Sequence, residues 1–259
     1  MKRIFSILVT ALVLFGAVSC KNKKDEPSAP KFTITVTDIM PTAALAHVTP
    51  SDNTKEYLVS WAKAEQVDGY ATPKAFAEAL VNTYKMMYQD YQFLKAAELI
   101  KSGKGEQQMP NLTSNTVYKV VISEIKDENL TIGEVATFTF TTEPWFTITV
   151  TDVTATTATI KVVPFDNTME YLVSWAKAEQ VDGYATPKLF AEALVNTYKT
   201  MYQNYAFLKS AQLIKSGEGI QQVTNLTSNT AYKVVISEIE DEDLTIGEVE
   251  TATFTTLAE

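Results

Sequence analysis

An internal repeat constrains the fold of this chain more than any other feature. Residues 32–142 match residues 146–256 at a constant offset of 114 positions, without a gap, and 86 of the 111 aligned positions are identical. Each copy has the length of one small domain and is large enough to bury its own core. We therefore expect two tandem domains, at residues 31–143 and 144–259, that each fold alone.

The chain begins with the features of a secretory leader. Two basic residues precede an apolar run, and Ser19 is a small residue before the only cysteine, Cys20. The pattern predicts a signal peptide at residues 1–19, too short to persist as a spanning helix. A cysteine in this place resembles the lipobox of bacterial lipoproteins, which implies that Cys20 is lipidated, although Ala17 stands where that motif usually has leucine. The alternative is an ordinary secretory signal with an incidental cysteine.

Residues 20–30 have the composition of a flexible tether. They are polar and charged and end in Pro, Ser, Ala and Pro, a composition that does not pack into a core. The Lys-Asp-Glu run at residues 24–26 resembles the charged export signals of surface lipoproteins in the Bacteroidetes. The resemblance implies an outer-membrane protein, anchored by lipid, that faces the cell exterior. The periplasmic face is the alternative, because any solvated tether tends to be charged.

The overall charge excludes nucleic acid as a partner. The chain has 31 acidic against 22 basic residues and a net charge of −9, whereas affinity for nucleic acid depends on neutralising phosphates. Anionic lipid heads would repel such a surface, so membrane attachment depends on the N-terminal lipid. A lipidated Cys20 also leaves no thiol for a disulfide, and burial alone must stabilise the folded part.

Both ends of each copy have the residue alternation of β-strands. In the first copy, apolar residues alternate with threonine at residues 32–39, and tyrosine, valine and tryptophan share one face at residues 57–61. Five such segments, rich in threonine and separated by turns, predict an antiparallel β-sandwich. Trp61 and Trp175 alternate with valine, and we expect them in the core.

The run NLTSNTVYKVVISEI at residues 111–125 resembles a fibronectin type III domain. It matches that family's entry into the sixth strand, where a tyrosine closes a corner by bonding to upstream backbone. The matching residues are Leu112, Thr116 and Tyr118, repeated as Leu226, Thr230 and Tyr232. The resemblance covers residues 32–65 and 107–142 and implies a mainly β chain of two tandem fibronectin III-like antiparallel sandwiches. It fails in the middle of each copy.

The middle of each copy predicts a helical insertion, at about residues 72–103 and 186–217. Thr72 can cap a helix whose first turn contains Pro73, and aromatic and apolar residues then recur at helical spacing. A break is expected at residues 90–92, followed by a second short helix at residues 93–101 that Gly103 ends. Sandwiches with this insertion are similar to tandem domains of Bacteroidetes-type outer-membrane lipoproteins.

The repeat contains little that could support catalysis. His47 is the only histidine and its counterpart is Lys161, and the chain has no nucleophile elbow, phosphate loop or HExxH motif. Glu65 and Asp68 could form a carboxylate pair or lie in a solvated loop. The acidic turn at residues 127–129 could hold calcium or be a plain hairpin turn. We expect no enzymatic activity, no cofactor and no metal site.

Tyrosines concentrate in the two insertions, together with amide side chains. This is the composition of surfaces that stack on sugar rings or bind a protein. The candidate ligand-binding residues are Tyr70, Tyr88, Tyr91, Tyr184, Tyr202 and Tyr205. The alternative is that these rings are the buried face of a helix packed on the sheet.

The sequence therefore predicts a lipid-anchored, non-catalytic surface protein for binding or adhesion. It would recognise a glycan or a host protein through the aromatic insertions, and duplication would raise avidity for a repetitive target. The alternative is a structural spacer or accessory subunit of a surface complex, with no ligand of its own.

Overall fold

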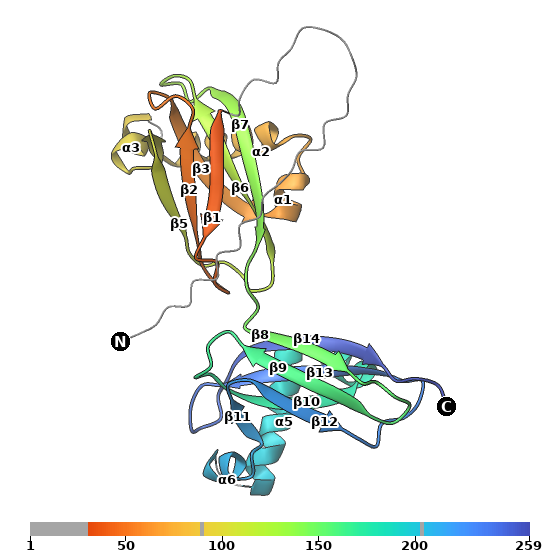
Figure 1. Cartoon of the computed structure of the whole chain (residues 1–259). Helices are drawn as coiled ribbons and strands as arrows, with labels where there is room; N and C mark the ends of the chain where they lie inside the picture. The colour runs from red at the N-terminus through yellow and green to blue at the C-terminus, as the bar shows by residue number, and fades with distance from the viewer. Residues whose placement is uncertain (1–30, 89–90, 203–204) are drawn as a thin grey trace. The chain divides into compact units, whose positions relative to one another are not determined.

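The computed structural model describes residues 31–88, 91–202 and 205–259. The chain divides into two compact units, unit 1 ending at Glu143 and unit 2 beginning at Pro144, and each contains the same elements in the same order (Figure 1). The predicted leader at residues 1–19, Cys20 and the tether at residues 20–30 lie outside the described residues. Within the described part of the chain, no helix is long and apolar enough to cross a membrane.

Unit 1 has seven strands and three helices among its described residues. The strands are β1 (Phe32–Thr37), β2 (Ala44–Pro50), β3 (Glu56–Lys63), β4 (Ile100–Ser102), β5 (Gly105–Met109), β6 (Val117–Ile125) and β7 (Ile132–Thr141). The helices are α1 (Ala64–Asp68), α2 (Pro73–Tyr88) and α3 (Tyr91–Ala96), all between β3 and β4.

Unit 2 repeats this order. Its strands are β8 (Phe146–Thr151), β9 (Ala158–Pro164), β10 (Glu170–Lys177), β11 (Ile214–Ser216), β12 (Gly219–Val223), β13 (Ala231–Ile239) and β14 (Ile246–Thr255). Its helices are α4 (Ala178–Asp182), α5 (Pro187–Tyr202) and α6 (Tyr205–Ser210).

Each unit is a sandwich of a three-stranded and a four-stranded antiparallel sheet. The strand orders are β1-β2-β5 and β4-β3-β6-β7 in unit 1, and β8-β9-β12 and β11-β10-β13-β14 in unit 2. The predicted tyrosine corner is present, because the Tyr118 hydroxyl accepts the Thr113 N–H at 2.9 Å and the Tyr232 hydroxyl accepts that of Thr227 at 3.0 Å. The predicted fold class, two fibronectin III-like sandwiches with helical insertions, is confirmed.

The four-stranded sheet of unit 1 is buried on both faces. Val120 and Ile122 pack toward the three-stranded sheet, whereas Val121, between them, packs under the helices with Val81 and Leu94. All three β6 residues have 0% exposure. Helices α1 and α2 lie on the outer face of this sheet (Figure 1), so the insertion forms a third layer that provides a second core.

The insertion starts as predicted and ends differently. The Thr72 hydroxyl accepts the Ala75 N–H at 3.1 Å, which caps α2. The second helix predicted at residues 93–101 is wrong at both ends, because α3 starts at Tyr91 and ends at Ala96, and β4 then pairs with β3. Glu98 adopts a φ of 55° and ends the helix, whereas Gly103, with a φ of 66°, forms the turn between β4 and β5.

Two strands and one helix of each unit are absent from the sequence-based prediction. The strands are the short β4 and β5 of unit 1 and their counterparts in unit 2, which raise the count from the five predicted to seven. The helix is α1, which occupies the segment containing Glu65 and Asp68. Strands of three and five residues are too short to present a recognisable period.

Candidate functional site

Strand β10 has an open edge along much of its length. It pairs with β13 from Glu170 to Lys177, but β11 covers its other side only as far as the Leu172–Ile214 pair. From Val173 to Ala176 that side has no strand partner among the described residues. Strand β3 of unit 1 has the same open edge, since β4 pairs with it only as far as Leu58. Such an edge presents backbone donors and acceptors that can pair with another strand.

A groove of about 210 Å³, called here the edge groove, lies along the open edge of β10. Val173 and Trp175 line it from the strand. Helix α5 contributes Phe190 and Tyr198, and Gln221 comes from β12 of the other sheet. The edge groove is therefore bounded by the helical layer on one side and by the three-stranded sheet on the other.

The tryptophans of these edge strands are more exposed than predicted. Trp175 is 36% exposed. Trp61 is half-buried and packs against the core of unit 1 rather than within it. The expectation that both are core residues is therefore wrong for Trp175. The reason is the short β11, which leaves the end of β10 without a neighbouring strand to cover it.

One candidate tyrosine lies beside the edge groove, and a second makes the equivalent contact in unit 1. Tyr184 packs edge-to-face on Phe190, which lines the edge groove, with ring centroids 5.5 Å apart. Tyr70 packs in the same way on Phe76, at 5.4 Å. Both tyrosines are exposed, at 43% and 44%, so a ligand in the edge groove could reach the ring of Tyr184.

Tyr91 makes an internal contact through its hydroxyl. The hydroxyl donates to Oε2 of Glu56, while the Lys95 ammonium donates to Oε1 of Glu56 at 2.7 Å and lies 5.6 Å from the centre of the Tyr91 ring. Hydrogen bonds from Lys95 and Tyr91 hold the pKa of the Glu56 carboxyl below its usual range. The Glu56 carboxylate in turn raises the pKa of both Tyr91 and Lys95.

Unit 2 repeats this arrangement with Tyr205, Glu170 and Lys209. The Tyr205 hydroxyl donates to Glu170, and the Lys209 ammonium donates to the other carboxylate oxygen at 2.6 Å. The hydrogen bond to Glu170 is the main cause of a raised pKa for Lys209. In both units, the tyrosine that opens the short helix holds this helix against the first residue of the strand that pairs with β4 or β11.

The two remaining candidate tyrosines lie at the other end of the long helices. Tyr202 is half-buried and stacks on Phe207, with centroids 5.1 Å apart and planes 12° from parallel. Tyr88 is the last residue of α2, and its side chain lies outside the described residues. Neither residue is among those that line the edge groove.

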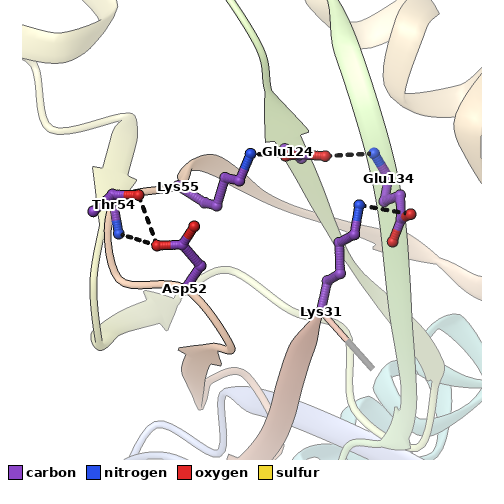
Figure 2. A network of polar contacts seen from close by, with 6 residues as sticks. All are labelled: Lys31, Asp52, Thr54, Lys55, Glu124 and Glu134. Carbon is purple, nitrogen blue, oxygen red and sulfur yellow. Dashed lines mark hydrogen bonds and ion pairs between the residues drawn. The ribbon is translucent and has the colours of Figure 1, made fainter. Parts of the chain in front are cut away.

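A buried carboxylate lies at a β-bulge between β6 and β7 (Figure 2). Glu124 is 3% exposed. Its Oε2 accepts the backbone N–H of Glu134 at 3.1 Å, and its Oε1 pairs with the Lys55 ammonium at 3.2 Å. The backbone bond from Glu134 is the main cause of a lowered pKa for the Glu124 carboxyl.

The role of this carboxylate is structural. Lys55 is replaced by Met169 in unit 2, but Glu238 still accepts the Glu248 N–H at 3.0 Å. The feature shared by the two units is therefore the bond across the bulge rather than a charged cluster. A Cβ atom at Gly133 would collide with the Glu124 carboxylate, so glycine is required opposite the bulge.

His47 connects a hydroxyl and a carboxylate in unit 1 alone. Its Nε2 shares a hydrogen bond of 2.8 Å with Thr37 Oγ1, and its Nδ1 lies 3.2 Å from Oε1 of Glu106. A hydroxyl, an imidazole and a carboxylate in this order resemble a hydrolase triad. Sequence reasoning missed the arrangement because only the strand register brings the three residues together. The Glu106 side chain is 67% exposed, and unit 2 has Lys161 and Ile220 in place of His47 and Glu106, so we assign a cross-strand contact on a solvated sheet face.

The other acidic candidates make local contacts. Asp68 forms an ion pair with Lys119. Asp127 accepts the N–H groups of Asn129 and Thr131 at 3.0 and 3.2 Å, as in a tight turn. Within the described ranges, no group of three or more histidine, cysteine, aspartate or glutamate residues could hold a metal ion.

Comparison with known proteins gives a likeness to solved fibronectin type III structures. No protein-family model matches the chain, and no curated protein matches it. The chain is similar to the central fibronectin-III array of RIM-binding protein, at 12% identity and a TM-score of 0.25, over 87% of this chain and 60% of that one. It is also similar to a segment of two fibronectin type III domains from chicken tenascin, at 12% identity and a TM-score of 0.25, over 86% of this chain and 98% of that one. No ligand or partner follows from these values.

Proposed function

We propose that this protein is a lipid-anchored, non-catalytic binding or adhesion protein of the outer membrane, facing the cell exterior. The observation that supports binding is the edge groove, in which a partly exposed tryptophan lies beside an unpaired strand edge. Nine of the ten residues that line it in unit 2 occur at the equivalent positions of unit 1, and the exception is Gln212, which corresponds to Glu98.

The groove has the chemistry of a recognition surface. Trp175 and Phe190 offer apolar ring faces, while Gln212 and Gln221 offer amide donors and acceptors. Rings beside amides are typical of surfaces that bind glycans or proteins, and these are the two ligand classes that we propose. Two copies in one chain would raise the avidity for a repetitive target without new contacts.

The six candidate tyrosines divide into different roles in this proposal. Tyr184 extends the aromatic surface beside the edge groove, and Tyr70 makes the equivalent ring contact in unit 1. Tyr91 and Tyr205 position the short helices through Glu56 and Glu170. Tyr88 and Tyr202 remain candidates for ligand contact at the ends of α2 and α5, separate from the groove.

A structural spacer is the second candidate function. It is favoured by the contact of Tyr91 with Glu56, because this contact uses an aromatic side chain of the insertion to stiffen the unit. A spacer would need rigid units and no ligand, and it would leave the edge groove unused.

The deciding experiment is a glycan array and a panel of host surface proteins, probed with the chain from Lys31 to Glu259. A double variant, Trp61→Ala with Trp175→Ala, removes the tryptophan of the edge groove and its counterpart in unit 1, and Trp145→Ala serves as a matched loss of tryptophan elsewhere. The proposal expects the wild-type chain and the Trp145→Ala variant to bind the same target and the double variant to lose it. Absence of binding by the wild-type chain would favour the spacer.

A further inference from the structure

We infer that the edge groove of unit 2 binds an extended peptide segment carrying a carboxylate, and that this segment joins the four-stranded sheet as a new strand beside β10. The inference rests on the proposed function, because it takes the edge groove as the binding site. It adds that the ligand is a polypeptide rather than a glycan, and that one of the ligand's side chains is a carboxylate.

The backbone argument comes from the register of β10. Four consecutive residues, Val173 to Ala176, lack a strand partner on one side within the described part of the chain, while their other side is fully paired with β13. Four residues of strand span about 13 Å, enough for several main-chain hydrogen bonds to an added segment. Peptides that bind by extending a sheet obtain affinity from such bonds and specificity from the pockets for alternate side chains.

The groove offers different surroundings to the two faces of an added strand. On one face lie the aromatic rings of Phe190 and Tyr198 from α5. On the other face lie Trp175 and Lys215. Tyr171, Val173 and Trp175 share this face of β10 because they lie at every second position. Lys215 lies on it too, because it is directly opposite Tyr171 in the pairing of β11 with β10. A segment with apolar residues at alternate positions would fit this pattern, with an acidic residue among the positions between them.

The charge argument comes from Lys215. Its ammonium donates to Oε1 of Gln221 at 2.8 Å, and no carboxylate of the described residues lies within ion-pair distance of it. Lys161, by contrast, pairs with Glu218 at 2.7 Å. Burial lowers the pKa of Lys215, and a carboxylate brought to this half-buried ammonium would favour its charged form. The edge groove thus complements an acidic side chain.

The two units differ at one groove position, and the difference is electrostatic. Unit 1 has Glu98 where unit 2 has Gln212. The Glu98 carboxylate at this position of unit 1 would repel an acidic peptide, so we expect unit 2 to bind it more tightly. This natural difference provides a substitution that the fold already accepts, Gln212→Glu.

The test is selection from a displayed library of ten-residue peptides on the chain from Lys31 to Glu259. We expect enriched peptides to alternate apolar residues and to contain aspartate or glutamate. Replacing that acid by its amide in a selected peptide should weaken binding at least tenfold, and N-methylation of the peptide backbone at the pairing positions should abolish it. Hydrogen exchange should slow at Val173 to Ala176 when the peptide is bound.

Two protein variants test the charge assignment. Gln212→Glu and Lys215→Met should each weaken binding of the acidic peptide at least tenfold while changing binding of the amide peptide less than threefold. If Lys215→Met does not fold, Gln212→Glu alone decides, because unit 1 carries glutamate at that position.

Four results would overturn the inference. Peptides that bind equally well after N-methylation would exclude strand addition, and equal binding of acid and amide peptides would exclude the role of Lys215. If no peptide is enriched while a glycan binds in a manner that requires Trp175, the proposed function stands and the inference fails. If neither peptide nor glycan nor host protein binds, both fail.

Discussion

The hydroxyl of Tyr91 donates a hydrogen bond to the carboxylate of Glu56 and so joins the first residue of α3 to the first residue of β3. The same relationship joins Tyr205 to Glu170 in unit 2. Because these hydroxyls hold the end of the insertion on the sheet, they fix the place where the chain returns to form the short strand β4 or β11. β4 and β11 pair with only the first three residues of β3 and β10, which leaves the rest of that edge open.

Removing the hydroxyl should therefore destabilise the unit. We expect Tyr91→Phe to lower the free energy of unfolding by about 1 kcal/mol, the usual contribution of one hydrogen bond. Tyr70→Phe, at an exposed ring, is the matched control and should have a smaller effect. Urea denaturation of both variants is the measurement, and equal effects would contradict the structural role of Tyr91.

Gly133 should not tolerate a side chain. We expect Gly133→Ala to cost about 1 to 3 kcal/mol, the usual range for overpacking, because its Cβ would collide with the Glu124 carboxylate. Gly69→Ala is the control, since its Cβ would lie 3.4 Å from the nearest atom, an ordinary contact. In a Glu124→Ala background the cost of Gly133→Ala should shrink, and purely additive effects would exclude this contact as the cause.

The Glu124 carboxyl should make stability depend on pH in the acidic range. Its folded pKa is lowered, so its contribution is present above the unfolded value of about 4.3 and is lost as pH falls through the folded pKa. We expect Glu124→Gln to reduce the loss of stability between about pH 5 and pH 3. Lys55→Met, which introduces the residue of unit 2, should have an intermediate effect because the bond from Glu134 remains. Denaturant titrations at several pH values measure the free energy of unfolding of both variants. If that free energy depended on pH in Glu124→Gln as it does in the wild type, the assignment would be contradicted.

Much of the fold follows from patterns that the sequence contains. The repeat predicts two units, alternation with threonine predicts the long strands, and Thr72 followed by Pro73 predicts the start of α2. Tyr118 predicts the corner because its spacing from Leu112 and Thr116 is specific to one strand entry. Apart from the repeat, each signal lies within a few neighbouring residues.

The edge groove could not be predicted in the same way. Strand β4 has three residues and therefore no measurable period, and its pairing with β3 as far as Leu58 alone depends on contacts between distant segments. Trp175 alternates with valine like a core residue, and only the missing neighbour strand makes it accessible. The internal use of Tyr91 depends on Glu56, which is 35 residues away.

The lipid anchor remains a prediction from the sequence. We expect Cys20→Ala to release the protein from the membrane fraction and to abolish its labelling by a fatty-acid analogue, since a lipidated cysteine with more than one acyl chain gives stable anchoring. The measurement is metabolic labelling with membrane fractionation in the native host. Labelling of the variant would show that the lipid, if any, is attached elsewhere.

The central claim is that ligand binds in the edge groove, and the most direct measurement is quenching of Trp175 fluorescence. A variant with Trp61→Phe and Trp145→Phe leaves Trp175 as the only tryptophan of the three in the chain. With the glycan, peptide or host protein identified by the arrays, bound ligand should shield Trp175 from acrylamide and reduce its quenching at least twofold. Saturating ligand that leaves the quenching of Trp175 unchanged would contradict the claim.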